Sequence, residues 1–202
     1  MSSSAAGDER SASRERAAER VAREELARVP DWLWDGRTLP VPVETIADSH
    51  YRLLVEEVSG LATRLDPADP IHVSGLLYPS QRLILIDAEE AARAPGRRRF
   101  SIAHELGHWI LHCAATHAEA IWCEDSLSAS AITDETARLR ATRTQEIEAN
   151  AFAAAVLMPR ELFLADPRPD GENEEYRLAR RFGVSRDALR RRYETLDSPT
   201  ER

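Results

Sequence analysis

The sequence has few cysteines and no long apolar segment, and both absences limit what the protein can be. Cys113 and Cys123 are the two cysteines among 202 residues. This is fewer than the disulfide framework of a small secreted protein needs. No apolar run approaches the ~20 residues that span a bilayer, and residues 1–20 contain no apolar region typical of a secretory signal. We therefore expect a cytoplasmic protein that does not enter a membrane.

The chain also has no excess of positive charge, because 35 acidic residues outnumber 27 basic ones and the formal net charge is −8. Such a balance argues against a surface devoted to nucleic acid. Residues 176–193 are an exception, with seven arginines against the single acidic residue Asp187. A solvated helical face is the more common meaning of such a run.

The pattern of apolar residues predicts an α+β fold in which a small antiparallel sheet packs on helices. Hydrophobic residues make up 43% of the chain, which is sufficient for a core. We expect a disordered tail over 1–13 and a loop or lid with a little helix over 114–141. The predicted helices cover 14–29, 43–49, 98–113, 144–159 and two segments within 174–195, and the predicted strands cover 52–58 and a hairpin over 71–87.

The stretch "FSIAHELGHWILHC", residues 100–113, has the spacing of a zinc-binding helix. His104 and His108 are four residues apart and therefore point to one face of a helix. Glu105 lies beside them, where its carboxylate can accept a proton from a water at the metal. Gly107, between the two histidines, permits close approach of another chain segment or of a substrate. A chance match of this short pattern is the alternative, although the apolar flanks disfavour it.

A catalytic zinc site needs a third protein ligand. His112 lies about 6 Å further along the helix axis and is too far to complete the site, so it is a candidate for a role beside the metal or towards the substrate. The downstream carboxylates are Glu119, Glu124, Asp125, Asp134, Glu135, Glu146 and Glu148. The first five lie in polar sequence where a charge needs no special explanation.

Glu146 and Glu148 differ because they open the largely apolar helix "TQEIEANAFAAAVLMP". Buried charges are usually paired or bound to metal. Asn150 is four residues after Glu146, on the same face, and can hydrogen-bond a ligand histidine. We therefore predict Glu146 as the third ligand and keep Glu148 in reserve. The alternative is a carboxylate that only benefits from the helix dipole.

The segment "RRFSIAHELGHWILH" followed by "EIEANAFAAAVLMP" resembles the ImmA/IrrE family of bacterial zinc metallo-endopeptidases. "LILID" and "LARRFGVSRDALRRRYETL" are also similar to this family, so the resemblance covers about residues 40–196. It implies a zincin-like peptidase domain over 14–170 and a helix-turn-helix-like segment over 171–202. It further implies His104, His108 and Glu146 as ligands of Zn²⁺, with Glu105 as the general base.

The resemblance also implies a function. Members of the family are expected to cleave helix-turn-helix transcriptional repressors in stress or mobile-element regulation. The segment "FGVSRDALRRR" supports a second hypothesis, a DNA-binding regulator with a vestigial metal site. Direct DNA binding is the less favoured of the two because the chain as a whole is acidic.

Overall fold

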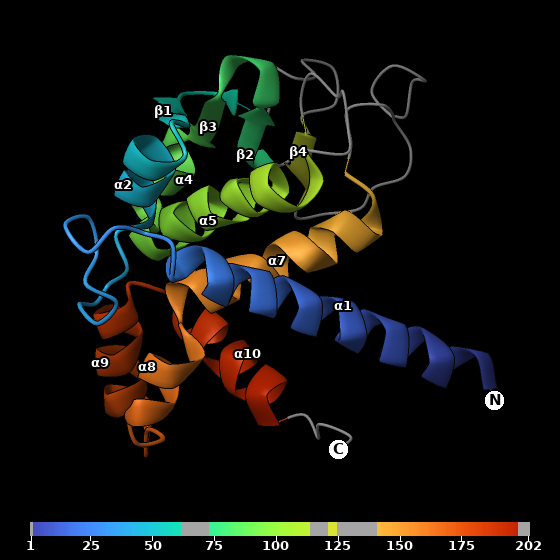
Figure 1. Cartoon of the computed structure of the whole chain (residues 1–202). Coiled ribbons are helices and arrows are strands. Elements are labelled where there is room, and N and C mark those ends of the chain that lie inside the picture. The colour runs from blue at the N-terminus through green and yellow to red at the C-terminus, as the bar shows by residue number, and fades with distance from the viewer. Residues whose placement is uncertain (1, 62–72, 114–120, 125–140, 198–202) are drawn as a thin grey trace.

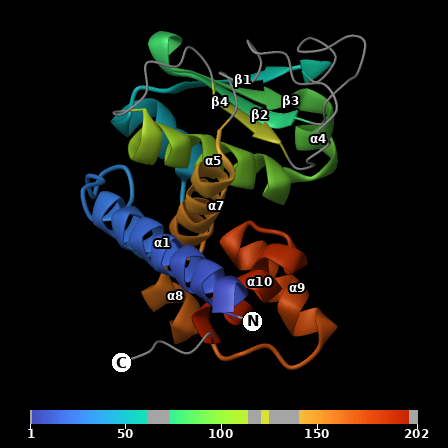
Figure 2. The same cartoon turned by 90° about the vertical axis from the view of Figure 1, so that its right-hand side faces the viewer.

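The computed structural model describes residues 2–61, 73–113, 121–124 and 141–197. A small sheet covers one side of α5, α7 crosses the other side, and α1 lies along α7 (Figure 1). The helices α8, α9 and α10 form the far end of the molecule, away from the sheet (Figure 2). The helices are α1 (Ser2–Leu26), α2 (Val43–Thr45), α4 (Ala88–Arg93), α5 (Pro95–His112), α7 (Arg143–Leu157), α8 (Arg160–Ala165), α9 (Glu172–Phe182) and α10 (Arg186–Asp197). A π-helical turn, η1 (Ile46–His50), follows α2, and a short 3₁₀ turn, η2 (Pro79–Gln81), joins the hairpin strands.

The sheet is mixed, so the prediction of an antiparallel sheet was wrong in one pairing. Its order is β1 (Leu54–Val58), β3 (Leu83–Asp87), β2 (Val73–Tyr78) and β4 (Ile121–Glu124). The predicted hairpin of β2 and β3 is confirmed. The first strand instead runs parallel to β3. The strand β2 runs opposite to β1, and β3 runs opposite to β2, so β1 and β3 have the same direction. Because β3 lies between β1 and β2 in the sheet, β1 pairs with a parallel neighbour.

The fourth strand lies in the stretch for which the sequence predicted a loop or lid. Residues 121–124 pair antiparallel with β2. The short run "IWC" is rich in residues that favour strands. The strand was not predicted because the run is short and polar sequence lies on both sides of it. The rest of the predicted lid, apart from residue 141, lies outside the described residues.

The two helices predicted to be central are both present. The first, α5, begins at Pro95, which suits the first turn of a helix because proline lacks an N–H. It is buried from Ser101 to His108 between the sheet and α7. The second, α7, begins at a capping box in which Thr142 and Gln145 exchange hydrogen bonds, and it ends before Pro159.

A helix also covers the amino-terminal stretch for which the sequence predicted disorder. Helix α1 starts at Ser2 and continues through the predicted 14–29 helix. Alanine, arginine and glutamate favour helix, and the Ser11 hydroxyl donates to Glu15 one turn later. Arg14, the residue directly after the stretch 1–13, contacts Glu148 of α7 at 3.6 Å.

The two helices predicted within 174–195 are confirmed as α9 and α10, and they share the main core. Gly183 ends α9 with a φ of 66°, a left-handed conformation that glycine adopts at little cost. Leu178, Phe182 and Leu189 pack in the same hydrophobic cluster as the buried residues of α5 and α7. Within the described ranges, no helix combines the length and the hydropathy that crossing a membrane requires.

Candidate metal centre

The two histidines of the H-E-x-x-H pattern lie side by side in the interior. His104 is 4% exposed and His108 is 0% exposed. Their Nε2 atoms are 2.9 Å apart, on the face of α5 that looks towards α7. One turn of helix separates them, as the spacing predicted.

Glu146 reaches the same point from α7. One of its carboxylate oxygens is 3.3 Å from Nε2 of His104, and the other is 3.3 Å from Nε2 of His108. Ligands of a tetrahedral Zn²⁺, each about 2.0–2.1 Å from the metal, are separated from one another by about 3.3–3.4 Å. The separations between these donors are therefore close to those that a shared ion imposes, and the three residues form a possible metal site.

The electrostatics of the three groups also fit a cation. Burial raises the pKa of Glu146, but hydrogen bonds from His104 and His108 outweigh it and lower this pKa to about 2. Burial lowers the pKa of His108 to about 4. Burial acts in the same direction on His104, yet the hydrogen bond to Glu146 and the charge of Glu105 raise its pKa. A carboxylate and two imidazoles held this closely in the interior form a donor set that a divalent ion such as Zn²⁺ satisfies.

Asn150 fixes the orientation of one candidate ligand. Its Oδ1 lies 3.0 Å from Nδ1 of His104. An amide oxygen can only accept, so this contact places a proton on Nδ1. When the ring is neutral, as a metal ligand must be, its lone pair is then on Nε2, which faces the site. The i+4 relation to Glu146 predicted this placement.

Glu105 is fully buried and packs against the sheet. A Cβ built on Gly75 of β2 would lie 3.0 Å from Oε1 and 3.3 Å from Cγ of Glu105. The missing side chain at position 75 therefore provides the space that the carboxylate occupies. We did not predict this role, although a glycine inside a strand is a known sign of a close approach.

Gly107 allows the two helices of the centre to meet closely. A Cβ at this position would lie 3.1 Å from Cδ1 of Phe152 and 3.3 Å from the backbone of Ala149. The sequence predicted that another chain segment or a substrate would approach Gly107. In the structure that segment is α7. This contact holds Glu146 at the distance from the histidines given above.

His112 and Glu148 stand beside the three-residue group and do not belong to it. Nε2 of His112 is 3.3 Å from the carbonyl oxygen of Gln145 and 3.8 Å from Glu148. Glu148 also contacts Arg14. Of the remaining carboxylates considered, Glu124 is the last residue of β4, and Glu119, Asp125, Asp134 and Glu135 lie outside the described residues.

A buried helix with two histidines and an adjacent glutamate, joined by a carboxylate from a second helix, defines a metallopeptidase-like domain. The model of the Peptidase M78 family, the IrrE N-terminal-like domain, matches residues 56–194, and the chain belongs to this family. The resemblance seen in the motifs is thereby confirmed.

Among solved structures, the chain is similar to a Mycobacterium tuberculosis transcriptional regulator, with 23% identity and a TM-score of 0.48. The match covers 94% of this chain and 49% of that one, so the chain spans about half the length of the regulator. Among curated proteins, none matches the chain.

Proposed function

We propose that the protein is a zinc-dependent endopeptidase. The observation that carries the proposal is the convergence of His104, His108 and Glu146 beside the buried carboxylate of Glu105. Membership of the Peptidase M78 family supports it. The three converging residues are the proposed ligands.

Each residue of the centre has a chemical role in this proposal. Zn²⁺, when bound, lowers the pKa of a water towards neutrality and polarises the carbonyl of the peptide bond. Glu105 accepts the proton of the attacking water and passes it to the leaving nitrogen. Asn150 holds the His104 ring in the tautomer that keeps Nε2 free for the metal.

The proposed substrate is a helix-turn-helix transcriptional repressor in the cytoplasm, in stress or mobile-element regulation. This part of the proposal is supported by the resemblance of the motifs to the ImmA/IrrE family.

The alternative, a DNA-binding regulator, has less support. Two arginines of α9 and α10 already form ion pairs within the protein. Arg190 pairs with Glu175 at 2.7 Å, and Arg181 pairs with Asp166 at 2.5 Å. A guanidinium that is already paired has less to gain from a phosphate.

The test compares the wild type with Glu105→Gln, using Glu161→Gln on the exposed start of α8 as a matched control. Zinc content is measured on each purified protein, and cleavage of repressor proteins from the same organism is followed by mass spectrometry. We expect near-stoichiometric zinc in all three proteins and cleavage by the wild type and Glu161→Gln alone. If Glu105→Gln cuts as fast as the wild type, the mechanism is wrong. A wild type that holds no zinc and binds duplex DNA in a salt-dependent manner would favour the alternative.

A further inference from the structure

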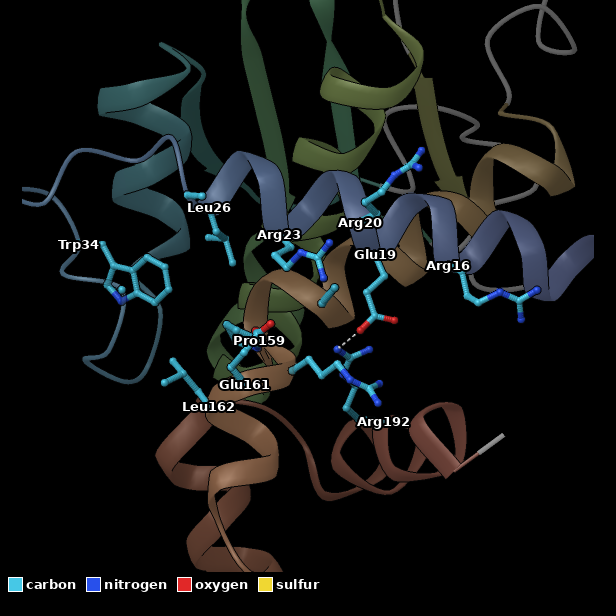
Figure 3. A pocket seen from close by; sticks show the side chains of 14 residues that line it. Arg16, Glu19, Arg20, Arg23, Leu26, Trp34, Pro159, Glu161, Leu162 and Arg192 are labelled. Atoms are coloured by element: carbon cyan, nitrogen blue, oxygen red, sulfur yellow. Dashed lines mark hydrogen bonds and ion pairs between the residues drawn. The ribbon is translucent and has the colours of Figure 1, made fainter. Parts of the chain in front are cut away.

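A groove of about 450 Å³ lies where α1, the end of α7, α8 and α10 meet (Figure 3). Its walls include residues from Arg16 to Ala27 of the α1 segment, Ala155 of α7 and Pro159 to Leu162. None of the residues of the metal centre lines it. Its volume falls within the range of about 300–1,000 Å³ that is typical of small-molecule sites.

One end of the groove is apolar. Leu26, Trp34 and Leu162 lie together there, away from Arg16 (Figure 3). The indole N–H of Trp34 donates to the carbonyl oxygen of Thr38 at 2.8 Å. This polar group is already satisfied, and Trp34 is 8% exposed, so the small part of the side chain that is open to the groove is ring surface, which suits an apolar or aromatic group.

The remainder of the groove is cationic. Its lining contains five arginines and two glutamates, a formal charge of +3 in a chain whose net charge is −8. Arg192 pairs with Glu19 at 2.6 Å, and Arg20 lies 3.9 Å from Glu24.

Three of the groove's arginines, Arg16, Arg23 and Arg160, have no acidic partner among the residues that the structure describes. They come from two different helices, α1 and α8, and border one hollow. Such guanidinium groups can bind a carboxylate or phosphate through paired hydrogen bonds.

We propose that this groove binds an amphipathic organic anion. The apolar or aromatic part of the ligand lies against Trp34, Leu26 and Leu162. Its carboxylate or phosphate group lies between Arg23 and Arg160. The site is separate from the proposed peptidase chemistry and does not depend on it.

The probe for the test is 8-anilinonaphthalene-1-sulfonate, an aromatic anion whose fluorescence rises in an apolar site. N-phenyl-1-naphthylamine, which has the same ring system without the sulfonate, measures the contribution of charge. The variant is Arg23→Gln/Arg160→Gln. The matched control is Arg37→Gln/Arg191→Gln, which removes two exposed arginines outside the groove.

We expect saturable binding of the sulfonate to the wild type and to the control. In Arg23→Gln/Arg160→Gln the Kd for the sulfonate should rise about tenfold, since two exposed ion pairs between the protein and the probe are lost. The neutral probe should bind both double variants with the same affinity. The Kd for the sulfonate should also rise with added salt. Competition by 1-naphthylacetate or by 1-naphthyl phosphate shows which anion the arginines prefer.

The proposal is overturned if the sulfonate binds the two double variants with equal affinity, or if the wild type shows no saturable binding. A uniform loss of binding to both double variants would also overturn it, because total charge and not the groove would then control binding. Circular dichroism of each variant excludes unfolding as the source of a fluorescence change.

Discussion

Replacing Glu146 by glutamine tests the third ligand most directly. The change keeps the size of the side chain and removes its charge from a point 3.3 Å from the Nε2 atoms of both His104 and His108. Residues that merely orient a ligand contribute about 10–100-fold to metal affinity. Loss of a ligand itself should therefore raise the Kd for zinc about 100-fold or more.

The expected effect appears in thermal unfolding as well as in metal content. A metal present at 100 times its Kd stabilises the folded state by about 2.7 kcal/mol. For a chain of this size, that corresponds to a rise in Tm of roughly 5–10 °C. The rise on adding zinc should be seen for the wild type, disappear after chelation, and fall to about 1–2 °C or less in Glu146→Gln at the same zinc concentration.

Glu148→Gln is the matched control, because Glu148 is on the same helix two residues later. It contacts Arg14 at 3.6 Å and His112 at 3.8 Å, outside the three-residue group. Its zinc-dependent rise in Tm should equal that of the wild type. An unchanged rise in Glu146→Gln, or an equal loss in Glu148→Gln, would refute the assignment of the third ligand.

Three further substitutions test individual contacts of the centre and of the fold. Gly75→Ala should leave zinc content nearly unchanged but lower the rate of peptide cleavage about 10- to 100-fold, because the new methyl group displaces the Glu105 carboxylate; an unaffected rate would contradict this role of Gly75. Asn150→Ala should weaken zinc binding about 10–100-fold by releasing the ring of His104, as measured by competition with a chelator, and an unchanged Kd would count against it. Arg192→Ala should lower the free energy of unfolding by about 2–4 kcal/mol in urea titrations, since removing this 2% exposed side chain leaves the Glu19 carboxylate and the Met158 carbonyl without their donor; a change within error would show that these contacts contribute little.

The sequence was most informative where a local pattern determines the structure. The spacing of His104 and His108 places them together on any helix, so their proximity could be predicted without knowledge of the fold. The choice of Glu146 needed one more step, the contrast between a charge and the apolar helix that carries it. Both helices and the hairpin of β2 and β3 were predicted for similar reasons.

Features that depend on distant parts of the chain were not predictable in this way. The parallel pairing of β1 with β3 follows from the position of β3 within the sheet, and the run "LLVEEV" is compatible with either direction. The packing of Glu105 against Gly75 joins a helix to a strand 30 residues earlier. The start of α1 at Ser2 was missed because the polar composition of this segment resembles that of disordered sequence.

The close contact of α5 with α7 at Gly107 has a mechanical consequence. The two histidines belong to the half of the molecule that contains the sheet, and Glu146 belongs to the half that contains α1 and the carboxyl-terminal helices. A metal shared by these residues would add a cross-link to the side-chain packing and the hydrogen bonds, such as that between His104 and Asn150, that join the two halves. Removal of the metal should accelerate amide hydrogen exchange along the facing sides of α5 and α7. Loss of the ion would then be detectable as a weaker contact between these two helices.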